Sequence, residues 1–284
     1  MPKGRGENKV EKGNGILGFV ANDASIMQCF AFQHKDKPWN HQTDDYESFS
    51  VGHYCSGNTL LSVQPTDSSH NLLLRDIIPE QGAQLLLAQA SMPFGGDDKK
   101  PSSVARWRNW LLASDGQFDW GDRRVRIQDN LPRFLNRVKA PGDNDLLFGQ
   151  LLSEFHDNRL MHLQSSSKKL ALQVQKTSRT AGPDVSVLLS NGNILLAYRR
   201  YGPLYYKVFE GIDNCERCAI LHPSERVQTR ARSHDYFRGI CVTNRPFGQE
   251  KWSEVPEESV LIIESSIKYS ILDKSEIQGS DDGG

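Results

Sequence analysis

Short apolar runs bounded by turn-forming residues mark the N-terminal part of the chain as rich in strands. Residues 16–21 are apolar throughout and end at a polar Asn-Asp pair, which predicts a buried strand. Residues 49–54 and 59–63 predict two strands that a Ser-Gly-Asn turn joins into a hairpin. Residues 83–90 form another largely apolar stretch before a loop rich in Gly and Pro.

Apolar runs bounded by turn-forming residues also occur in the C-terminal part. Residues 185–189 and 194–198 are apolar runs on either side of Asn191-Gly192, which is the clearest hairpin signal in the chain. Further strands are predicted at residues 204–209, 239–243 and 259–264.

Helical patterns are concentrated in the middle of the chain. Residues 110–113 predict a strand that ends at a Ser-Asp-Gly turn, and residues 130–138 predict a helix with an Asn cap and a Pro in its first turn. The acidic segment 142–145 caps a second helix, in which apolar residues recur at helical spacing up to Leu152. A helix of mixed polarity is expected after residue 165.

Strands at both ends and helices between them predict one α+β domain, with stacked sheets and helices outside them. We place this domain at residues 15–272. Residues 1–14 are charged and glycine-rich with one β-branched residue, and residues 273–284 are acidic. We expect both to be flexible tails, because neither offers enough apolar surface to offset the entropy of ordering.

Composition excludes several classes of function. A net charge of −1, with 24% charged residues, predicts neither nucleic acid nor a membrane surface as a partner. The apolar runs are too short to span a bilayer, and the N-terminus lacks the apolar core of a secretory signal. Five cysteines are an odd number at low density. They favour a reducing, cytoplasmic location over a disulfide framework.

The cysteine pair Cys215-x-x-Cys218 is the only metal-like spacing in the sequence. With His222 it resembles half a zinc site, which His234 or Cys241 would complete. The favoured interpretation is that these cysteines are reduced and pack in the core, so we predict no metal and no cofactor. A structural zinc is the alternative.

An ordered set of segments resembles the class II glutamine amidotransferases, which have the N-terminal-nucleophile hydrolase fold. The closest likeness is to the stand-alone type similar to the amidohydrolase of ergothioneine synthesis. Residues 16–23 resemble the first strand, residues 48–54 the second-strand pattern, and residues 110–116 the strand that ends in His-Asn-Gly in the family. Later likenesses are at residues 142–145, 187–199, 211–218, 241–247 and 252–256. The resemblance implies a four-layer α-β-β-α sandwich.

The family's chemistry requires a cysteine at the start of the first strand, whose thiolate attacks the amide of glutamine while its own free α-amino group acts as the base. The matching position here is Asn14, a carboxamide that is not a nucleophile at neutral pH. Residues 10–20 contain no thiol or hydroxyl, so cleavage of the tail would supply none. Cys29 follows the strand and is read as a core cysteine.

The family's oxyanion hole uses an Asn side chain and the next Gly N–H, and the matching pair here is Asp115-Gly116. An ionised Asp115 cannot donate a hydrogen bond and would repel an oxyanion. A protonated Asp115 would donate only if burial raised its pKa well above about 4. The simpler interpretation of Asp115-Gly116 is a turn.

Substrate recognition is altered as well. The family arginine that binds the α-carboxylate of glutamine is matched by Gln89. Gln89 lacks the positive charge of arginine and the paired N–H donors that bind a carboxylate in a bidentate way. Asp145 matches the acid that meets the α-ammonium group, and helix capping is its alternative role.

These departures predict a glutamine amidotransferase-like protein that has lost its nucleophile and serves as a non-catalytic subunit or binding module. The implied ligands are glutamine, a γ-glutamyl amide or a partner enzyme subunit. The alternative is an active glutamine or γ-glutamyl amide hydrolase with an atypical or relocated nucleophile.

Overall fold

The computed structural model describes most of the chain, with gaps between the described segments. Described are residues 14–34, 39, 46, 48–55, 58–65, 73–80, 82–91, 103–122, 124, 127, 142–161, 166–200, 202–212, 215, 217–218, 234–249 and 251–273. The predicted helix at residues 130–138, His222 and both predicted tails apart from Asn14 and Asp273 lie outside these residues.

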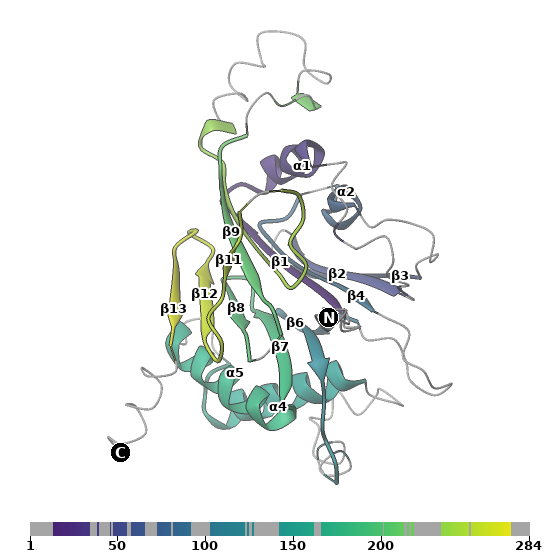
Figure 1. Cartoon of the computed structure of the whole chain (residues 1–284), viewed down its shortest axis with the longest axis vertical. Helices are drawn as coiled ribbons and strands as arrows, with labels where there is room; N and C mark the ends of the chain where they lie inside the picture. The colour runs from purple at the N-terminus through teal and green to yellow at the C-terminus, as the bar shows by residue number, and fades with distance from the viewer. Residues whose placement is uncertain are drawn as a thin grey trace, which may run out of the picture.

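Two antiparallel sheets form the centre of the protein (Figure 1). Among the described residues, the first sheet has seven strands in the order β11-β9-β10-β1-β4-β2-β3. Their bounds are β1 Gly15–Ala21, β2 Ser48–Cys55, β3 Asn58–Pro65, β4 Leu85–Ser91, β9 Tyr205–Glu210, β10 Arg238–Thr243 and β11 Ser253–Glu254. β1 lies in the middle, with β4 on one side and β10 on the other.

In the part of the chain that the structure describes, the second sheet has six strands in the order β13-β12-β8-β7-β6-β5. Their bounds are β5 Ala105–Trp107, β6 Trp110–Gln117, β7 Asp184–Ser190, β8 Ile194–Tyr198, β12 Val260–Glu264 and β13 Tyr269–Leu272. Both predicted hairpins are confirmed, since β2 pairs with β3 and β7 pairs with β8.

The helices cover the outer faces of the two sheets, which makes four layers (Figure 1). The helices α1 (Ala24–Gln33) and α2 (Leu74–Ile77) lie on the first sheet, and α4 (Asp143–Asp157) and α5 (Ser167–Ala181) lie on the second. The predicted α+β sandwich is therefore confirmed. Within the described segments, no helix is long and apolar enough to cross a membrane.

Apolar residues on both faces of the strands explain why these runs are continuous rather than alternating. In β1, Ile16 and Val20 point into the core between the sheets, whereas Leu17 and Phe19 pack under α1. In β6 the same alternation sends Leu111 between the sheets and Trp110 toward α4. A strand buried on both faces loses the period-2 signal, as is typical of layered folds with covered sheets.

The short strands β5, β11 and β13 and the helix α2 were not predicted, and two larger features also differ from the sequence prediction. The strand predicted to stop at Ala113 continues to Gln117, so Asp115-Gly116 is part of β6 and not a turn. The helix α1 was not predicted, because Ile26, Met27 and Phe30 are buried among other apolar residues and the segment lacks a clear polar face. Asp23 caps this helix by accepting the Ser25 backbone N–H at 2.9 Å.

Candidate functional site

The start of β1 and the end of β6 belong to different sheets, and one side chain connects them. Asn244, directly after β10, donates from Nδ2 to the backbone oxygen of Asn14 at 2.7 Å and to Oδ2 of Asp115 at 2.8 Å. Its Oδ1 accepts the Ile16 backbone N–H at 2.9 Å. The structure thus brings together Asn14, Asp115 and Gly116, the predicted nucleophile and oxyanion positions, around a residue that was not predicted to belong to the site.

The carboxyl group of Asp115 is buried, and burial raises its pKa from the ordinary value of 3.8 to about 6. The Asn244 hydrogen bond, the positive charge of Arg245 and the backbone N–H groups of Asn14 and Gly116 oppose this rise. Oδ1 of Asp115 is buried without a hydrogen-bond partner of standard geometry among the described residues. Desolvation therefore outweighs these favourable contacts, and the neutral carboxylic acid is present in a substantial fraction of molecules near pH 6.

Gly116 is a glycine for steric reasons. Its φ of +129° is a backbone conformation that residues with a Cβ rarely adopt. A Cβ at this position would lie 1.6 Å from the backbone oxygen of Asp184 on β7. The close approach of β6 and β7 at this point holds Asp115 against the start of β1.

A second group of side chains surrounds Gly15, the residue after Asn14. A Cβ on Gly15 would lie 3.3 Å from Tyr46 Oη, 3.4 Å from Arg245 Cδ and 3.4 Å from Trp39 Cζ2. The guanidinium carbon of Arg245 lies 5.4 Å from the centre of the Tyr46 ring, a cation–π geometry. Arg245 was not among the site residues predicted from the sequence. The available signal was a pair of polar residues directly after a buried strand.

Gln89 is completely buried in β4, and its side chain connects three elements. Its Nε2 donates to the Ser114 backbone oxygen at 3.1 Å, and its Oε1 accepts from Asn144 Nδ2 at 2.7 Å. Asn144 also donates to the Ser103 backbone oxygen at 2.7 Å, and its Oδ1 accepts the Ser114 hydroxyl. This network joins β4, β6 and the first turn of α4. The predicted contact between Gln89 and a substrate carboxylate stays a prediction.

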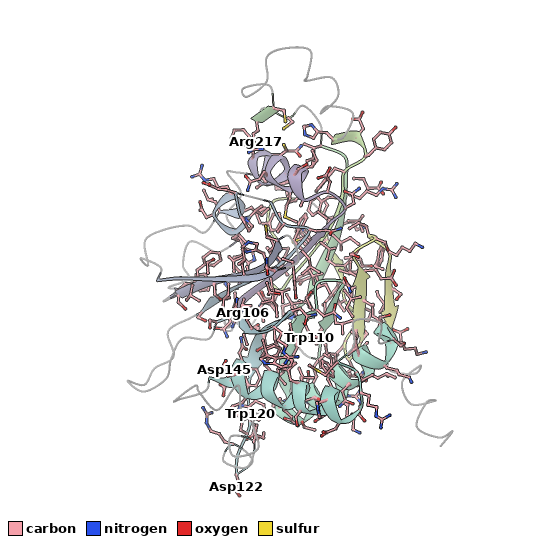
Figure 2. The ribbon with its side chains drawn as sticks, turned by 180° about the vertical axis from the view of Figure 1, so that it is seen from behind. Arg106, Trp110, Trp120, Asp122, Asp145 and Arg217 are labelled. Carbon is pink, nitrogen blue, oxygen red and sulfur yellow. The ribbon has the colours of Figure 1, made fainter. Side chains whose placement is uncertain are left out.

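Asp145 lies in the first turn of α4, and Figure 2 shows it near Trp120. Its Oδ2 accepts the backbone N–H of Gly142 at 3.1 Å, so it caps the helix as the alternative interpretation expected. A contact between Asp145 and a ligand ammonium group stays a prediction.

None of the five cysteines occupies the predicted nucleophile position. Cys241 is fully buried on the α1 side of β10, where burial raises the pKa of its thiol well above the ordinary value. Cys55 ends β2. Cys29, Cys215 and Cys218 gather with His234 beside α1, away from the start of β1.

Comparisons with known proteins find similar structures but no similar sequences. No family model matches the sequence, and no curated protein sequence matches it. A glutamine aminotransferase class-II domain protein from Silicibacter pomeroyi superposes with a TM-score of 0.51 at 15% identity, covering 91% of this chain and 98% of that one. A predicted glutamine amidotransferase from Pseudomonas aeruginosa superposes with a TM-score of 0.50 at 12% identity, covering 93% and 100%.

These similarities extend over nearly the whole length of both proteins. At such low identity they establish the fold alone. The chain has the four-layer fold of class II glutamine amidotransferase domains, which is the N-terminal-nucleophile hydrolase fold that its sequence resemblance implied.

Proposed function

We propose that the chain is a glutamine amidotransferase-like protein that does not hydrolyse amides and acts as a non-catalytic subunit or binding module. Asn14 takes the place of the family's nucleophile, and its nitrogen is bonded to Gly13 in the chain. A carboxamide side chain cannot form the acyl-enzyme intermediate on which the family's reaction depends.

The single observation that carries this proposal is the pair of hydrogen bonds by which the Asn244 side chain connects Asn14 to Asp115, called the Asn244 bridge below. Its Nδ2 donates both to the Asn14 backbone oxygen and to the Asp115 carboxyl group. The polar groups at the nucleophile and oxyanion positions therefore stabilise the junction of the two sheets. An ionised Asp115 at this point would raise the energy of a tetrahedral oxyanion, because the two negative charges repel each other.

We expect the purified full-length protein to show no hydrolysis of L-glutamine or γ-glutamyl-p-nitroanilide at pH 5 or pH 8. Released ammonia and p-nitroaniline report the two reactions. The Asp115→Asn variant restores an amide donor at the oxyanion position, and we expect it to be equally inactive because position 14 still lacks a nucleophile. Turnover above a heat-denatured control by either protein would contradict the proposal.

The raised pKa of Asp115 favours one specific form of the alternative, an amide hydrolase with a relocated nucleophile. Below pH 6 a protonated Asp115 can donate a hydrogen bond to an oxyanion. This second candidate predicts hydrolysis that increases as the pH falls through about 6. It also predicts that Asp115→Asn keeps the activity at pH 8. The same assays therefore separate the two candidates.

We expect no cysteine to behave as an activated nucleophile. Under native conditions at pH 7, alkylation by iodoacetamide should be confined to partly exposed thiols, with Cys55 as the first site, at no more than the rate of glutathione. Peptide mapping after short exposure measures the rate at each site, and a Cys55→Ser variant confirms the assignment. Alkylation of one thiol about 100-fold faster than glutathione would support the hydrolase instead.

Glutamine, γ-glutamyl amides and a partner enzyme subunit are the ligands that we propose for the binding role. A shift in melting temperature with millimolar L-glutamine but not with D-glutamine would support a retained small-ligand site. Stoichiometric co-purification of one enzyme would support a subunit role. We place the protein in the reducing cytoplasm, in keeping with the five free cysteines of the structure.

A further inference from the structure

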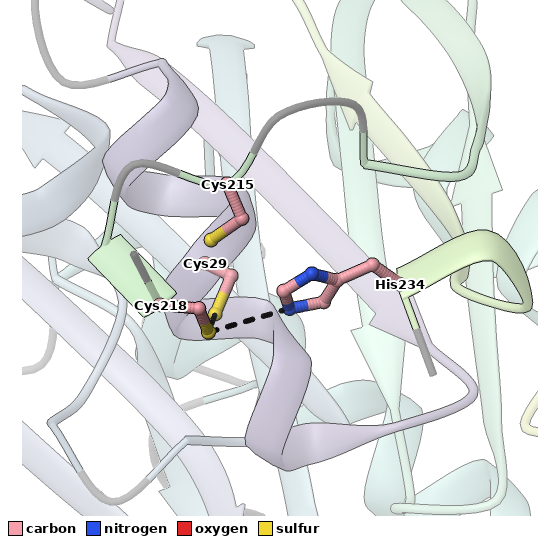
Figure 3. A group of neighbouring side chains, drawn as sticks. All are labelled: Cys29, Cys215, Cys218 and His234. Atoms are coloured by element: carbon pink, nitrogen blue, oxygen red, sulfur yellow. Dashed lines mark hydrogen bonds between the residues drawn. The ribbon is translucent and has the colours of Figure 1, made fainter. Parts of the chain in front are cut away.

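Three thiols and one imidazole converge at one point beside α1 (Figure 3). Cys29 comes from α1, Cys215 and Cys218 follow β9, and His234 precedes β10. Cys29, Cys218 and His234 are buried, with exposed fractions of 2%, 4% and 3%, and Cys215 is half-buried. The sequence pattern indicated Cys215, Cys218 and His234, but Cys29 was missed because it is remote in the chain. Cys241 is not part of the group.

We propose that Cys29, Cys215, Cys218 and His234 bind a structural zinc ion. The inference does not depend on the proposed function. All four ligand atoms lie within 4.8 Å of one another. The Sγ atoms of Cys29 and Cys218 are 3.6 Å apart, and Cys218 Sγ is 3.6 Å from His234 Nε2.

The Cys29–Cys218 and Cys218–His234 separations are close to the edges of a zinc tetrahedron, and the remaining ligand-atom separations are at most 4.8 Å. Zn–S bonds of about 2.3 Å and Zn–N bonds of about 2.0–2.1 Å place neighbouring sulfurs about 3.8 Å apart and a sulfur and a nitrogen about 3.6 Å apart. A disulfide would require the two sulfurs to lie about 2.05 Å apart. The observed spacing therefore fits ligands around a common ion.

The donor set also selects the metal. Three thiolates and an imidazole form a soft Cys₃His set, which favours zinc over magnesium, calcium or manganese. Because four protein ligands fill the tetrahedron, no position remains for water or substrate, which is the pattern of structural zinc.

The surroundings balance the charge of such a site. Three thiolates and one Zn²⁺ carry a net charge of −1, and the guanidinium of Arg217 lies 3.8 Å from Cys29 Sγ. Arg217 lies at the α1 end of the molecule, far from Asp145 (Figure 2). Groups that hydrogen-bond to metal ligands from the outer shell orient these ligands and tune the metal.

The ion would connect α1 to the segment between β9 and β10. Next to this group, Phe30 of α1 packs on Phe209 of β9 and on Phe237, with ring centres 4.7 Å and 5.9 Å apart. The backbone oxygen of His234 accepts the N–H groups of Ile212 and Phe237, which holds the histidine at the end of this aromatic layer. Zinc would thus stabilise the outer layer over the first sheet.

Metal analysis of the full-length protein, purified without chelators, tests the site directly. We expect about one zinc per chain by plasma mass spectrometry. The Cys218→Ser variant should retain less than about a tenth of it, because three ligands hold zinc far more weakly than four. His234→Cys keeps four zinc ligands and should keep the metal, and the control variant Cys55→Ser should match the parent protein.

A second measurement does not require a variant to fold. Titration of the parent protein with a mercurial reagent should release zinc to a coloured chelator as the three thiols are modified. Reconstitution with Co²⁺ should produce the thiolate charge-transfer and tetrahedral absorption bands. Four results would each overturn the assignment. The first is absence of zinc together with failure to bind Co²⁺ after reduction, and the second is a disulfide between Cys29 and Cys218 in the purified protein. The others are iron in place of zinc, and full zinc content in Cys218→Ser.

Discussion

The Gly116→Ala variant is expected to lose more than about 4 kcal/mol of folding free energy, or to fail to fold. The added Cβ would lie 1.6 Å from the Asp184 backbone oxygen and 2.6 Å from its carbonyl carbon. Both obstacles are backbone atoms of the neighbouring strand, so no side-chain rotation relieves them. The φ of +129° adds strain for any residue with a Cβ. Urea denaturation followed by circular dichroism measures the loss.

Gly202→Ala is the matched control for this variant. A Cβ at Gly202 would meet no atom within 4 Å, so its substitution should change stability by no more than about 0.5 kcal/mol. Similar small changes for both glycines would contradict the close β6–β7 approach. A loss confined to Gly116→Ala would support the extension of β6 past Asp115, the feature that places this carboxyl group against the start of β1.

The Asp115→Asn variant is expected to be more stable than the parent protein by about 3 kcal/mol at pH 8 and by about 1 kcal/mol at pH 4.5. Asp115 has a pKa of about 6 in the folded protein, compared with 3.8 as its ordinary value. Asn is neutral at every pH, and its oxygen still accepts the hydrogen bond that Asn244 donates to Asp115. The variant therefore removes the cost of burying a charge and keeps the bridge between the sheets.

The direction of the pH effect follows from proton linkage. Between pH 4 and pH 6 the folded protein holds the Asp115 proton more tightly than the unfolded chain does. The stability of the parent therefore decreases as the pH rises through this window and levels off above pH 6. Thermal melts from pH 4.5 to pH 8 should show a gap between variant and parent that widens with pH.

Asp273→Asn provides the control for a general loss of negative charge, because Asp273 is exposed near the end of the described chain. It should follow the parent protein at every pH. If Asp115→Asn and the parent changed in parallel with pH, the carboxyl group of Asp115 would not be the buried acid that the structure describes. The Asn244 bridge would then need another explanation.

Much of the architecture was predictable because it is encoded in local apolar runs. The two hairpins followed from turn residues placed between apolar runs, and the helix that begins after Gly142 followed from its acidic cap and the helical spacing of its apolar residues. The sequence resemblance also predicted that Asn14 and Asp115 belong to one site, and the structure connects them through Asn244. The helix α1 was not predictable in this way, because its buried positions do not form a narrow stripe.

By itself, the sequence determined most of the longer strands, the two hairpins, the layered class of fold and the absence of a thiol at the first strand, because these depend on residue type and spacing along the chain. Only the tertiary structure decided that β6 runs through Asp115-Gly116, that burial raises the pKa of that carboxyl group, and that Cys29 joins Cys215, Cys218 and His234. Each of these depends on distances between segments remote in sequence. Desolvation and metal-ligand geometry exist only after those segments have packed together.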